Sequence, residues 1–341
     1  MKTVFIVDDN DTNLMAAKLA LSGIYKTFAL PSSERMFQLL ERLTPDLILL
    51  DVDMPEMDGY QTIQTLKSSS KHKSIPVIFL TAKQDAESEI RGFELGALDY
   101  INKPFSPPVL VRRIETHIET DKLIKQGQAK IFELHNATIT VISDMVEKRD
   151  TVTGGHIERT QMYLEILIDA LIRGEVYTEE IHAWDLNLLL PSAQLHDVGK
   201  ITISDTILNK PGKLSDEEFE LIKTHTTEGE RIIDLITERT QDEGFLRHAR
   251  LFAGCHHEKW NGKGYPRGLQ GTDIPLEGRI MAVVDVYDAL VCDRPYKKPF
   301  SHEEAVEIIT KDSGTHFDPS IISVFTEVAD AFREKFLEMA L

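Results

Sequence analysis

The sequence has few features that mark secreted or membrane proteins. Its two cysteines, Cys255 and Cys292, are too few for a disulfide framework, and a chain of 341 residues does not need one. No stretch approaches the ~20 apolar residues of a membrane-spanning helix. The apolar run near the start ends in acids after Val7, which is too short for a signal peptide. We therefore expect a cytoplasmic protein without membrane insertion.

Positive charge is also scarce. The chain has 38 Lys and Arg against 56 Asp and Glu, a formal net charge of −18, and no block of basic residues. Non-specific nucleic-acid binding and attachment to anionic membranes are therefore excluded as leading functions, and no basic recognition helix indicates DNA binding. Any anionic ligand must be held by local positive charge or by metal. The 42% of hydrophobic residues indicates a globular protein, and the length predicts two domains.

The first 120 residues alternate between two kinds of apolar pattern. Short β-rich runs occur at 3–7, 46–50, 75–80 and 97–101, with a weaker run at 26–30, and segments of helical spacing separate them. This alternation predicts a doubly wound α/β domain, in which helices cover both faces of a parallel sheet. Ligands of such sheets bind beyond the carboxyl ends of the strands.

Five polar residues are expected at those strand ends. Three carboxylates that converge there repel one another unless a cation joins them, and oxygen ligands suit Mg²⁺ or Mn²⁺. A nearby Lys and Thr can hold the oxygens of a phosphoryl group on one carboxylate. One acid at a strand end often only caps a helix, but five residues of these types favour a phosphoryl site: Asp8, Asp9, Asp51, Thr81 and Lys103.

This part of the chain resembles the receiver domain of two-component response regulators. The matching strings are FIVDDND, LILLDVDMPEMDGY, IFLTAK and LDYINKPF. The resemblance implies that a cognate sensor histidine kinase is the partner and that Asp51 is the phospho-acceptor. It implies that Asp8, Asp9 and the backbone of Asp53 surround Mg²⁺. It also implies that Thr81 and Lys103 contact the phosphoryl group and that Tyr100 is the aromatic switch residue.

The connector between the two domains is predicted to be a helix over about 107–148. Ile124, Ile131, Thr138 and Met145 recur seven residues apart, which is the spacing of a short coiled-coil seam. Pairing with a second copy and packing of one amphipathic helix on its own domain explain this pattern equally well. The stretch 121–130, rich in charge and Gln, is the expected flexible joint.

From about residue 140 the apolar spacing is helical, which predicts an all-α bundle. Acids and histidines lie within or beside its apolar runs, where a buried carboxylate costs several kcal/mol unless it is paired or bound to metal. Lys and Arg could pair the acids but do not account for the histidines. Five imidazoles and two carboxylates suit two first-row metal ions: His156, His196, Asp197, His225, His256, His257 and Asp285.

This second part resembles the HD-GYP family, a branch of the HD metal-dependent phosphohydrolases that degrades cyclic di-GMP. The matching strings are TGGHIERT, LHDVGKITI, ILNKPGKLSDEEFELIKTH, HHEKWNGKGYPRG, RIMAVVDVYDALVCDRPYKK and GTHFDP. The resemblance implies that the seven residues above are metal ligands with Asp197 as the bridge. It further implies that Lys200 touches the scissile phosphate or the attacking water. Arg294 and Lys297 would contact substrate phosphates, and Tyr265 would shape the guanine-side pocket.

The chain departs from the three-metal members of that family at one position. Those members have a Glu four residues before the first ligand His, where this chain has Val152. We therefore expect two metals, with Fe or Mn ahead of Ni or Zn, and a linear dinucleotide product in preference to GMP. Two metals would lower the pKa of a bridging water and so supply hydroxide near neutral pH.

Together these features predict a response regulator with a receiver domain at 1–120, a helical linker at 121–140 and an HD-GYP domain at 141–341. Phosphorylation of Asp51 would control hydrolysis of cyclic di-GMP to linear pGpG, and further hydrolysis to GMP is left open. One alternative is a signalling protein that binds metal and nucleotide, or a GGDEF-type partner, with little turnover. Another is a phosphohydrolase of a different cyclic dinucleotide. A homodimer is expected through the connector.

Overall fold

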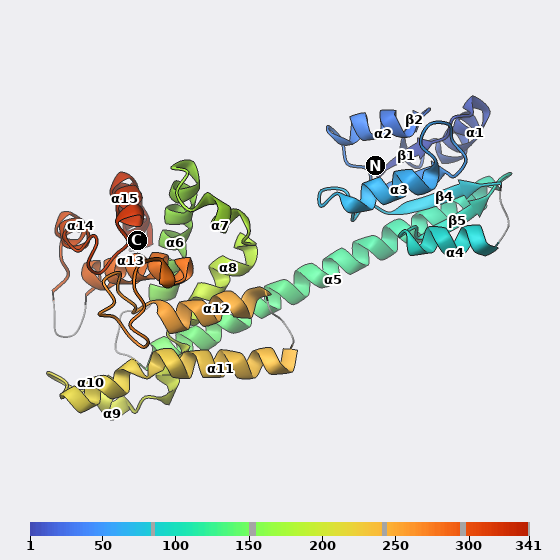
Figure 1. Cartoon of the computed structure of the whole chain (residues 1–341). Coiled ribbons are helices and arrows are strands. Elements are labelled where there is room, and N and C mark those ends of the chain that lie inside the picture. Colours follow the sequence, from blue (N-terminus) through green and yellow to red (C-terminus); the bar gives the residue numbers. More distant parts are fainter. Residues whose placement is uncertain (83–85, 150–154, 241–243, 294–297, 340–341) are drawn as a thin grey trace. The chain divides into compact units, whose positions relative to one another are not determined.

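A computed structural model describes residues 1–82, 86–149, 155–240, 244–293 and 298–339, and the chain divides into two compact units, Met1–Ile131 and Phe132–Leu341 (Figure 1). The first unit contains a five-stranded parallel sheet in the order β2-β1-β3-β4-β5. Its strands are β1 (Thr3–Val7), β2 (Lys26–Leu30), β3 (Leu47–Asp51), β4 (Val77–Thr81) and β5 (Asp99–Asn102). The doubly wound α/β prediction is confirmed, including the weak strand at 26–30.

Helices cover both faces of this sheet because successive side chains of a buried strand point to opposite sides. In β1, Val4 and Ile6 pack against α1 (Asp11–Leu21) and the first turns of α5, whereas Phe5 and Val7 pack against α2 (Ser33–Leu40) and α3 (Gly59–Ser68). The remaining helix of this unit is α4 (Ala86–Glu94). All four of these β1 residues are fully buried, which fixes the register of the central strand.

Three strands lie one or two residues later in the chain than the sequence predicts. Asp46 does not begin β3, because its carboxylate accepts a hydrogen bond from the backbone N–H of Thr3 at 2.7 Å and pairs with Lys2. Pro76 has no N–H for the sheet ladder, so β4 begins after it, at Val77. As a result Asp51 and Thr81 are the last residues of their strands.

The connector is one long helix, α5 (Pro107–Glu147), as predicted. The stretch 121–130 lies inside this helix without a break, so the structure contradicts the expectation of a joint there. An exposed segment can remain helical when few of its residues have low helix propensity. Gly127 is the only glycine of this segment. The first turns of α5 belong to the sheet core through Leu110, Ile114 and Ile118.

The second unit is helical, as predicted. Its helices are α6 (His156–Arg173), α7 (Thr178–His182), α8 (Leu186–Ser192), η1 (Ala193–Leu195), η2 (Val198–Thr202), α9 (Asp205–Leu208), α10 (Asp216–Lys223), α11 (His225–Thr240), α12 (Gly244–Cys255), η3 (Gly271–Asp273), α13 (Leu276–Val291), α14 (His302–Lys311) and α15 (Pro319–Met339).

Two apolar clusters hold this unit together. The larger one joins α6, α13, α14 and α15 around Tyr163, Tyr287 and Phe332. The smaller one joins α11 and α12 to the end of α5 through Ile139. None of the helices in the described residues is long and apolar enough to cross a bilayer.

Candidate phosphoryl site and metal centre

The carboxyl end of the sheet in the first unit brings three acids together. Carboxylate oxygens of Asp8, Asp9 and Asp51 all lie within 4.8 Å of one another. Lys103 follows β5, and its Nζ lies 2.7 Å from Asp8 Oδ2 and 2.7 Å from Asp51 Oδ1. Three negative charges therefore face one ammonium group, and this all-oxygen donor set fits Mg²⁺.

Asp51 is held in an environment that disfavours its own negative charge. Burial raises the pKa of Asp51, and the Asp8 carboxylate adds to the rise, while Lys103 opposes it. Asp8 is itself fully buried and accepts hydrogen bonds from Asn10 N at 2.9 Å and Asn13 Nδ2 at 3.1 Å. A divalent cation beside these two carboxylates would remove the conflict.

The other predicted residues of this site lie around the same edge. Thr81 is buried at the end of β4, and its carbonyl oxygen accepts a hydrogen bond from Lys103 N at 2.8 Å. Asp53 is exposed two residues beyond Asp51. Tyr100 of β5 points inward, because its ring packs 5.2 Å from both Phe79 and Phe93.

The inward position of Tyr100 depends on a glycine. A Cβ atom at Gly92 of α4 would lie 1.4 Å from the Tyr100 hydroxyl, so only glycine leaves room for this ring position. The same hydroxyl donates a hydrogen bond to the Ser88 carbonyl at 3.2 Å. Tyr100 therefore links β5 to α4 next to the acidic edge.

In the second unit, six of the seven predicted metal ligands form two groups of three. The first triad is His156, His196 and Asp285, and the second triad is His225, His256 and His257; within each, one ligand atom per residue lies within 4.8 Å of the others. The ligands come from helix ends and one helix interior. His156 and His225 are the first residues of α6 and α11, His196 follows η1, His256 and His257 follow α12, and Asp285 lies within α13.

Asp197, the seventh predicted ligand, lies between the two triads. Its Oδ2 is 3.4 Å from His196 Nε2, whereas its Oδ1 is 3.4 Å from His225 Nε2 and 3.8 Å from His256 Nε2. Oδ1 is buried and has no hydrogen-bond partner among the described residues. A buried carboxylate oxygen without a partner is costly, and a cation at each end of this carboxylate would satisfy both oxygens.

The imidazoles are oriented for metal binding by hydrogen bonds from their other ring nitrogen. Nδ1 of His196 lies 2.9 Å from the Ala193 carbonyl, Nδ1 of His225 lies 2.7 Å from the Ile222 carbonyl, and Nδ1 of His256 lies 2.8 Å from the Phe252 carbonyl. Because a carbonyl only accepts, Nδ1 carries the hydrogen and Nε2 presents a lone pair.

These lone pairs converge in both triads. Nε2 of His156 lies 3.4 Å from Nε2 of His196, and Nε2 of His225 lies 3.4 Å from Nε2 of His256. Two lone pairs directed at one point repel each other unless a cation lies between them. This donor set of imidazole and carboxylate fits a pair of first-row divalent metals.

Burial also favours the protonation states that metals require. It lowers the pKa of His225, it lowers the pKa of His256 to about 3, and it holds the pKa of His257 well below the usual range. Burial alone would raise the pKa of Asp197, but the charges of Lys200 and His196 hold it well below its usual value. His225, His256 and His257 are therefore neutral near pH 7 and Asp197 is ionised, which are the states that bind metal. His196 differs from them, because burial acts to lower its pKa but the Asp197 charge outweighs burial and raises it.

Two residues that the sequence analysis missed support the first triad. Asp288 is buried in α13, and its Oδ2 lies 2.7 Å from His156 Nδ1. Arg159 of α6 donates two hydrogen bonds to Asp288, from Nε at 2.7 Å and from Nη2 at 3.0 Å. Each lies three residues after a predicted ligand, so the i, i+3 spacing on one helix face was the available signal.

Lys200 and Tyr265 border the centre from two further segments. Nζ of Lys200 lies 2.8 Å from Asp197 Oδ2. The ring of Tyr265 stacks obliquely on His257, with centroids 4.7 Å apart. Tyr265 therefore lies directly against a candidate ligand of the second triad.

The loop that carries Tyr265 is held by buried acids. Glu258 accepts hydrogen bonds from Arg267 N at 2.8 Å and Leu269 N at 3.0 Å, and the Arg267 side chain pairs with Glu230. The charge of Arg267 is thus neutralised within the fold. Arg294, Lys297 and Val152 lie outside the described residues.

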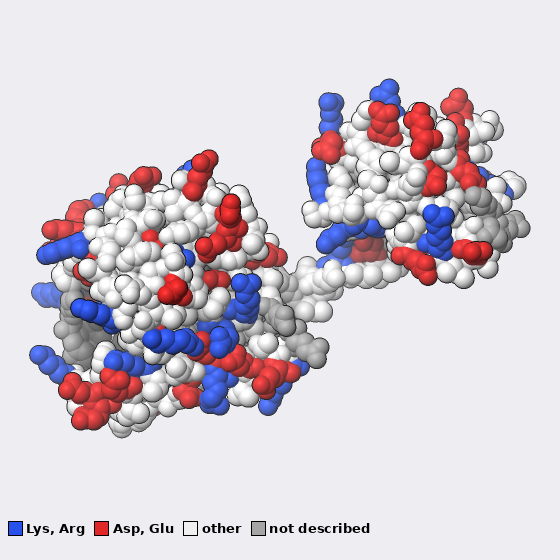
Figure 2. Space-filling view, in the orientation of Figure 1, with Lys and Arg blue, Asp and Glu red and all other residues white. Residues whose placement is uncertain are grey.

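Basic side chains form no broad surface on the face of the molecule that Figure 2 shows. There, Lys and Arg lie among Asp and Glu over both units. This distribution agrees with the net charge of −18 and with an anionic ligand that depends on metal and a few local cations.

Comparison with known proteins identifies a family for each part of the chain. The response regulator receiver domain family matches residues 4–115, and the HD domain family matches residues 140–321. A protein of Vibrio cholerae serotype O1, named "Probable cyclic di-GMP phosphodiesterase", is 39% identical over 340 residues, which cover 95% of this chain and 77% of that protein.

Two further relatives extend this comparison. A "Cyclic di-GMP phosphodiesterase" of Thermotoga maritima is 33% identical over 360 residues, covering 98% of this chain and 93% of the relative. A "3'3'-cGAMP-specific phosphodiesterase 2" of Vibrio cholerae is 38% identical over 191 residues, covering 56% of this chain and 34% of the relative. This chain has a receiver domain at its start and two candidate metal-binding triads in its second unit, and it belongs to the HD domain family of metal-dependent hydrolases, with relatives named cyclic di-GMP phosphodiesterases.

Proposed function

We propose that this chain hydrolyses cyclic di-GMP to linear pGpG at the two triads of the second unit. The observation that carries the proposal is the position of Asp197, whose two carboxylate oxygens face different triads. The names of two relatives that cover most of this chain suggest the substrate. Two divalent ions, with Fe or Mn preferred, would lower the pKa of a shared water and provide hydroxide near neutral pH.

The residues of the chain itself have separable roles in this reaction. Asp197 joins the two triads, and Lys200, 2.8 Å from it, places a positive charge where negative charge grows on the phosphoryl oxygens. Tyr265 bounds the substrate side beside His257. We further propose that Arg294 and Lys297 hold the substrate phosphates. Position 152 is Val in this chain, where the three-metal members of the family have Glu. This difference supports a site with two metals and a hydrolysis that ends at pGpG.

The test is chromatography of cyclic di-GMP after incubation with the anaerobically purified full chain, in Mn²⁺ and in Fe²⁺. We expect pGpG in excess over GMP. The double variant His196→Ala, Asp197→Ala should lose bound metal and turnover together, while Arg294→Ala should weaken substrate binding with the metal content unchanged. Bound metal and retained cyclic di-GMP without product would instead identify a binding protein.

A second substrate is favoured by one observation. The relative that is 38% identical over 191 residues is named for 3'3'-cGAMP, which carries one adenine in place of a guanine. The same experiment with 3'3'-cGAMP decides between the two, because the preferred substrate has the higher kcat/KM.

We propose that phosphorylation of Asp51 by a sensor histidine kinase, with Mg²⁺ bound at Asp8 and Asp9, controls this hydrolase through α5. Polar contacts of α5, and of Arg149 just after it, with segments next to the candidate metal ligands support the proposal. Thr140 Oγ1 donates to Gln194 Oε1 at 2.9 Å, two residues before His196. Beyond the helix, Arg149 donates to the carbonyls of Ile201 and Ile203, close to Lys200.

We also propose that α5 pairs with α5 of a second copy. An outer stripe of α5, defined as Ile124, Ile131, Leu134, Val141 and Met145, is 55 to 70% exposed. The inner face, with Ile139, Ser143 and Val146, is buried. At ~100° per residue the two faces point about 120° apart, so packing on the chain's own unit does not use the heptad positions.

Sedimentation of the full chain tests this pairing. Leu134→Glu with Val141→Glu adds two charges to the outer stripe and should dissociate the dimer. Gln126→Glu with Gln128→Glu adds the same charge to α5 beside the stripe and should leave the dimer intact. A monomer in both the parent and the control would contradict the pairing.

A further inference from the structure

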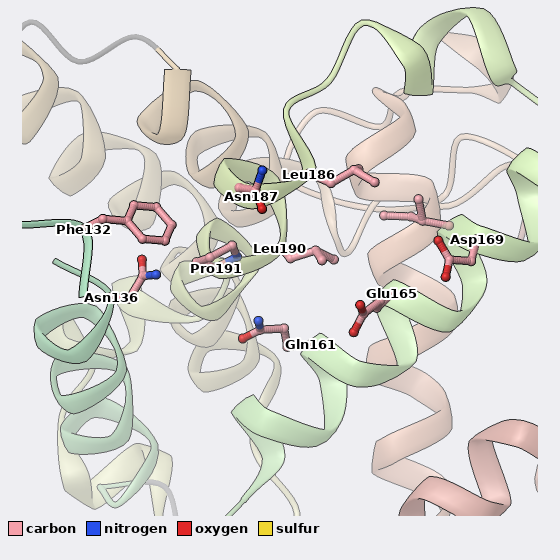
Figure 3. A pocket seen from close by; sticks show the side chains of 10 residues that line it. Phe132, Asn136, Gln161, Glu165, Asp169, Leu186, Asn187, Leu190 and Pro191 are labelled. Atoms are coloured by element: carbon pink, nitrogen blue, oxygen red, sulfur yellow. The ribbon is translucent and has the colours of Figure 1, made fainter. Parts of the chain in front are cut away.

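A cavity of the second unit lies between α5, α6 and α8, and its volume is about 320 Å³ (Figure 3). In Figure 3, Phe132 and Asn136 of α5 line one side, Leu186 and Leu190 of α8 line another, and Glu165 of α6 lies opposite them. The complete lining is Phe132, Asn136, Gln161, Glu165, Ile168, Asp169, Leu186, Asn187, Leu190 and Pro191. It contains none of the proposed metal ligands.

The lining combines apolar walls with negative charge. Glu165 and Asp169 lie four residues apart on α6, so their carboxylates occupy one face of the helix. The ten lining residues include no Lys or Arg. A cation with an apolar body matches such a surface, whereas an anion would be repelled.

The amide groups at the rim also favour a ligand that donates hydrogen bonds. Asn136 Oδ1 is buried and has no hydrogen-bond partner among the described residues. Asn187 Nδ2 donates to Asp185 Oδ1 at 3.1 Å, which leaves the carbonyl oxygen of Asn187 for other contacts. An ammonium group has three donors and no acceptor, so it complements these oxygens and the two carboxylates together.

Hydrogen bonds link the cavity to Gln194, which lies two residues before the candidate metal ligand His196. Gln161 lines the cavity, and its Oε1 accepts a hydrogen bond from Gln194 Nε2 at 2.7 Å. Gln194 in turn accepts from Thr140 of α5 and stands two residues before His196. The helix that carries Gln161, Glu165 and Asp169 begins at His156. A ligand here would therefore contact α5 and the helix that presents a candidate metal ligand.

We propose that this cavity binds a small organic amine, with one or two positive charges on an apolar chain or ring. The ammonium group lies against Glu165 and Asp169, and the apolar part lies between Phe132, Leu186 and Leu190. Rotation of the Asn136 amide brings its oxygen to the ligand. The site is separate from the proposed substrate site, so the two proposals fail independently.

Binding of phenethylamine and of spermidine to the full chain tests the proposal, with saturation-transfer NMR for contacts and calorimetry for affinity. We expect a Kd below about 1 mM for at least one of the two amines. Because a protein of net charge −18 attracts any polyamine, charge-matched variants are needed. Glu165→Gln with Asp169→Asn should weaken binding about tenfold or more. Glu327→Gln with Glu334→Gln, which removes two exposed acids of α15, should change it less than about twofold.

Two results of these experiments would overturn the proposed amine site. Equal loss of affinity in both double variants would show diffuse attraction to an acidic surface and overturn the site. The absence of binding by either amine at about 1 mM would do the same. Asn136→Leu, which keeps the bulk of the side chain but removes the acceptor, should weaken binding in a chain that retains its metal content, and unchanged binding would remove Asn136 from the site.

Discussion

Asp288 accepts a hydrogen bond from His156 Nδ1 at 2.7 Å and two more from the guanidinium of Arg159, one on each carboxylate oxygen. This contact fixes which nitrogen of His156 presents its lone pair to the first triad. A carboxylate partner also makes the imidazole a stronger metal ligand. Burial of the Asp288 charge is tolerated because both of its oxygens are paired.

Asp288→Asn should therefore weaken metal binding at the first triad. The amide carries no charge, so His156 becomes a poorer ligand and Arg159 loses its counter-ion. We expect metal affinity at one of two sites to fall about 10- to 100-fold, measured by metal titration of the full chain. Asp318→Asn is the matched control, because Asp318 is equally buried and pairs with Arg279 in the same unit. Equal loss of metal in both variants would show that a general loss of stability is responsible.

Asp51→Asn should abolish phosphorylation of the receiver by acetyl phosphate. The variant keeps the size of the side chain but removes the nucleophilic carboxylate oxygen that faces Lys103. Incorporation of labelled phosphate is the measurement. Labelling that persists in the variant would place the acceptor on another residue, and Asp53→Asn, which changes an exposed acid two residues away, is the comparison.

Thr140→Val should uncouple the receiver from the hydrolase. The substitution keeps the shape of the side chain and removes the hydroxyl that donates to Gln194. We expect the ratio of turnover between phosphorylated and unphosphorylated chains to move toward one, with the metal content unchanged. Thr116→Val is the control on the same helix. Among the described residues, the Thr116 hydroxyl donates to the Arg112 carbonyl, which also belongs to α5. A ratio unaffected by Thr140→Val would direct attention to the Arg149 contacts.

Two glycine substitutions should have opposite effects on stability. A Cβ at Gly199 would lie 1.9 Å from the His225 carbonyl oxygen and 2.5 Å from Gly229 N, so Gly199→Ala must separate η2 from α11 and disturb both Asp197 and His225. It should lose metal while receiver phosphorylation persists. At Gly127, in the exposed middle of α5, a Cβ meets nothing within 4 Å. Gly127→Ala should stabilise the helix by about 1 kcal/mol, observed by thermal unfolding. Metal retention in Gly199→Ala would contradict the close packing.

Asp99 makes the receiver sensitive to acid. Burial acts to raise the pKa of Asp99, but hydrogen bonds from His117 at 3.1 Å and Arg113 at 2.6 Å outweigh it and hold the pKa below its usual value. Because the folded pKa is the lower one, the stabilisation is complete above the unfolded pKa of about 3.9 and is lost as the pH falls through the folded pKa. Asp99→Asn should therefore destabilise the receiver at pH 7, and the difference from the parent in denaturant unfolding should shrink toward low pH. A difference that does not change with pH would exclude a contribution from the Asp99 charge.

The fold of the first unit and the candidate site residues could be predicted from the sequence. The alternation of short β-rich runs with helical spacing predicts the doubly wound sheet, because the periods of the two element types differ and each must bury one face. The parallel order then requires Asp8, Asp51 and Lys103 to meet at one edge. The seven candidate metal ligands could be proposed because charged and imidazole groups inside apolar runs have few explanations other than metal.

The contacts around the candidate ligands could not be predicted from the sequence and are seen only in the folded chain. Asp288, Arg159 and Gln194 are ordinary polar residues in the sequence, and their roles depend on contacts between segments far apart in the chain, such as the 2.7 Å approach of Asp288 to His156. The heptad pattern of α5 fitted two explanations, and exposure of the outer stripe supports the proposed pairing, because periodicity alone does not say which face of a helix is covered. Local sequence fixes the residue types and their spacing; the geometry that allows one carboxylate, Asp197, to face two triads comes from the packing of η1, α11 and α12.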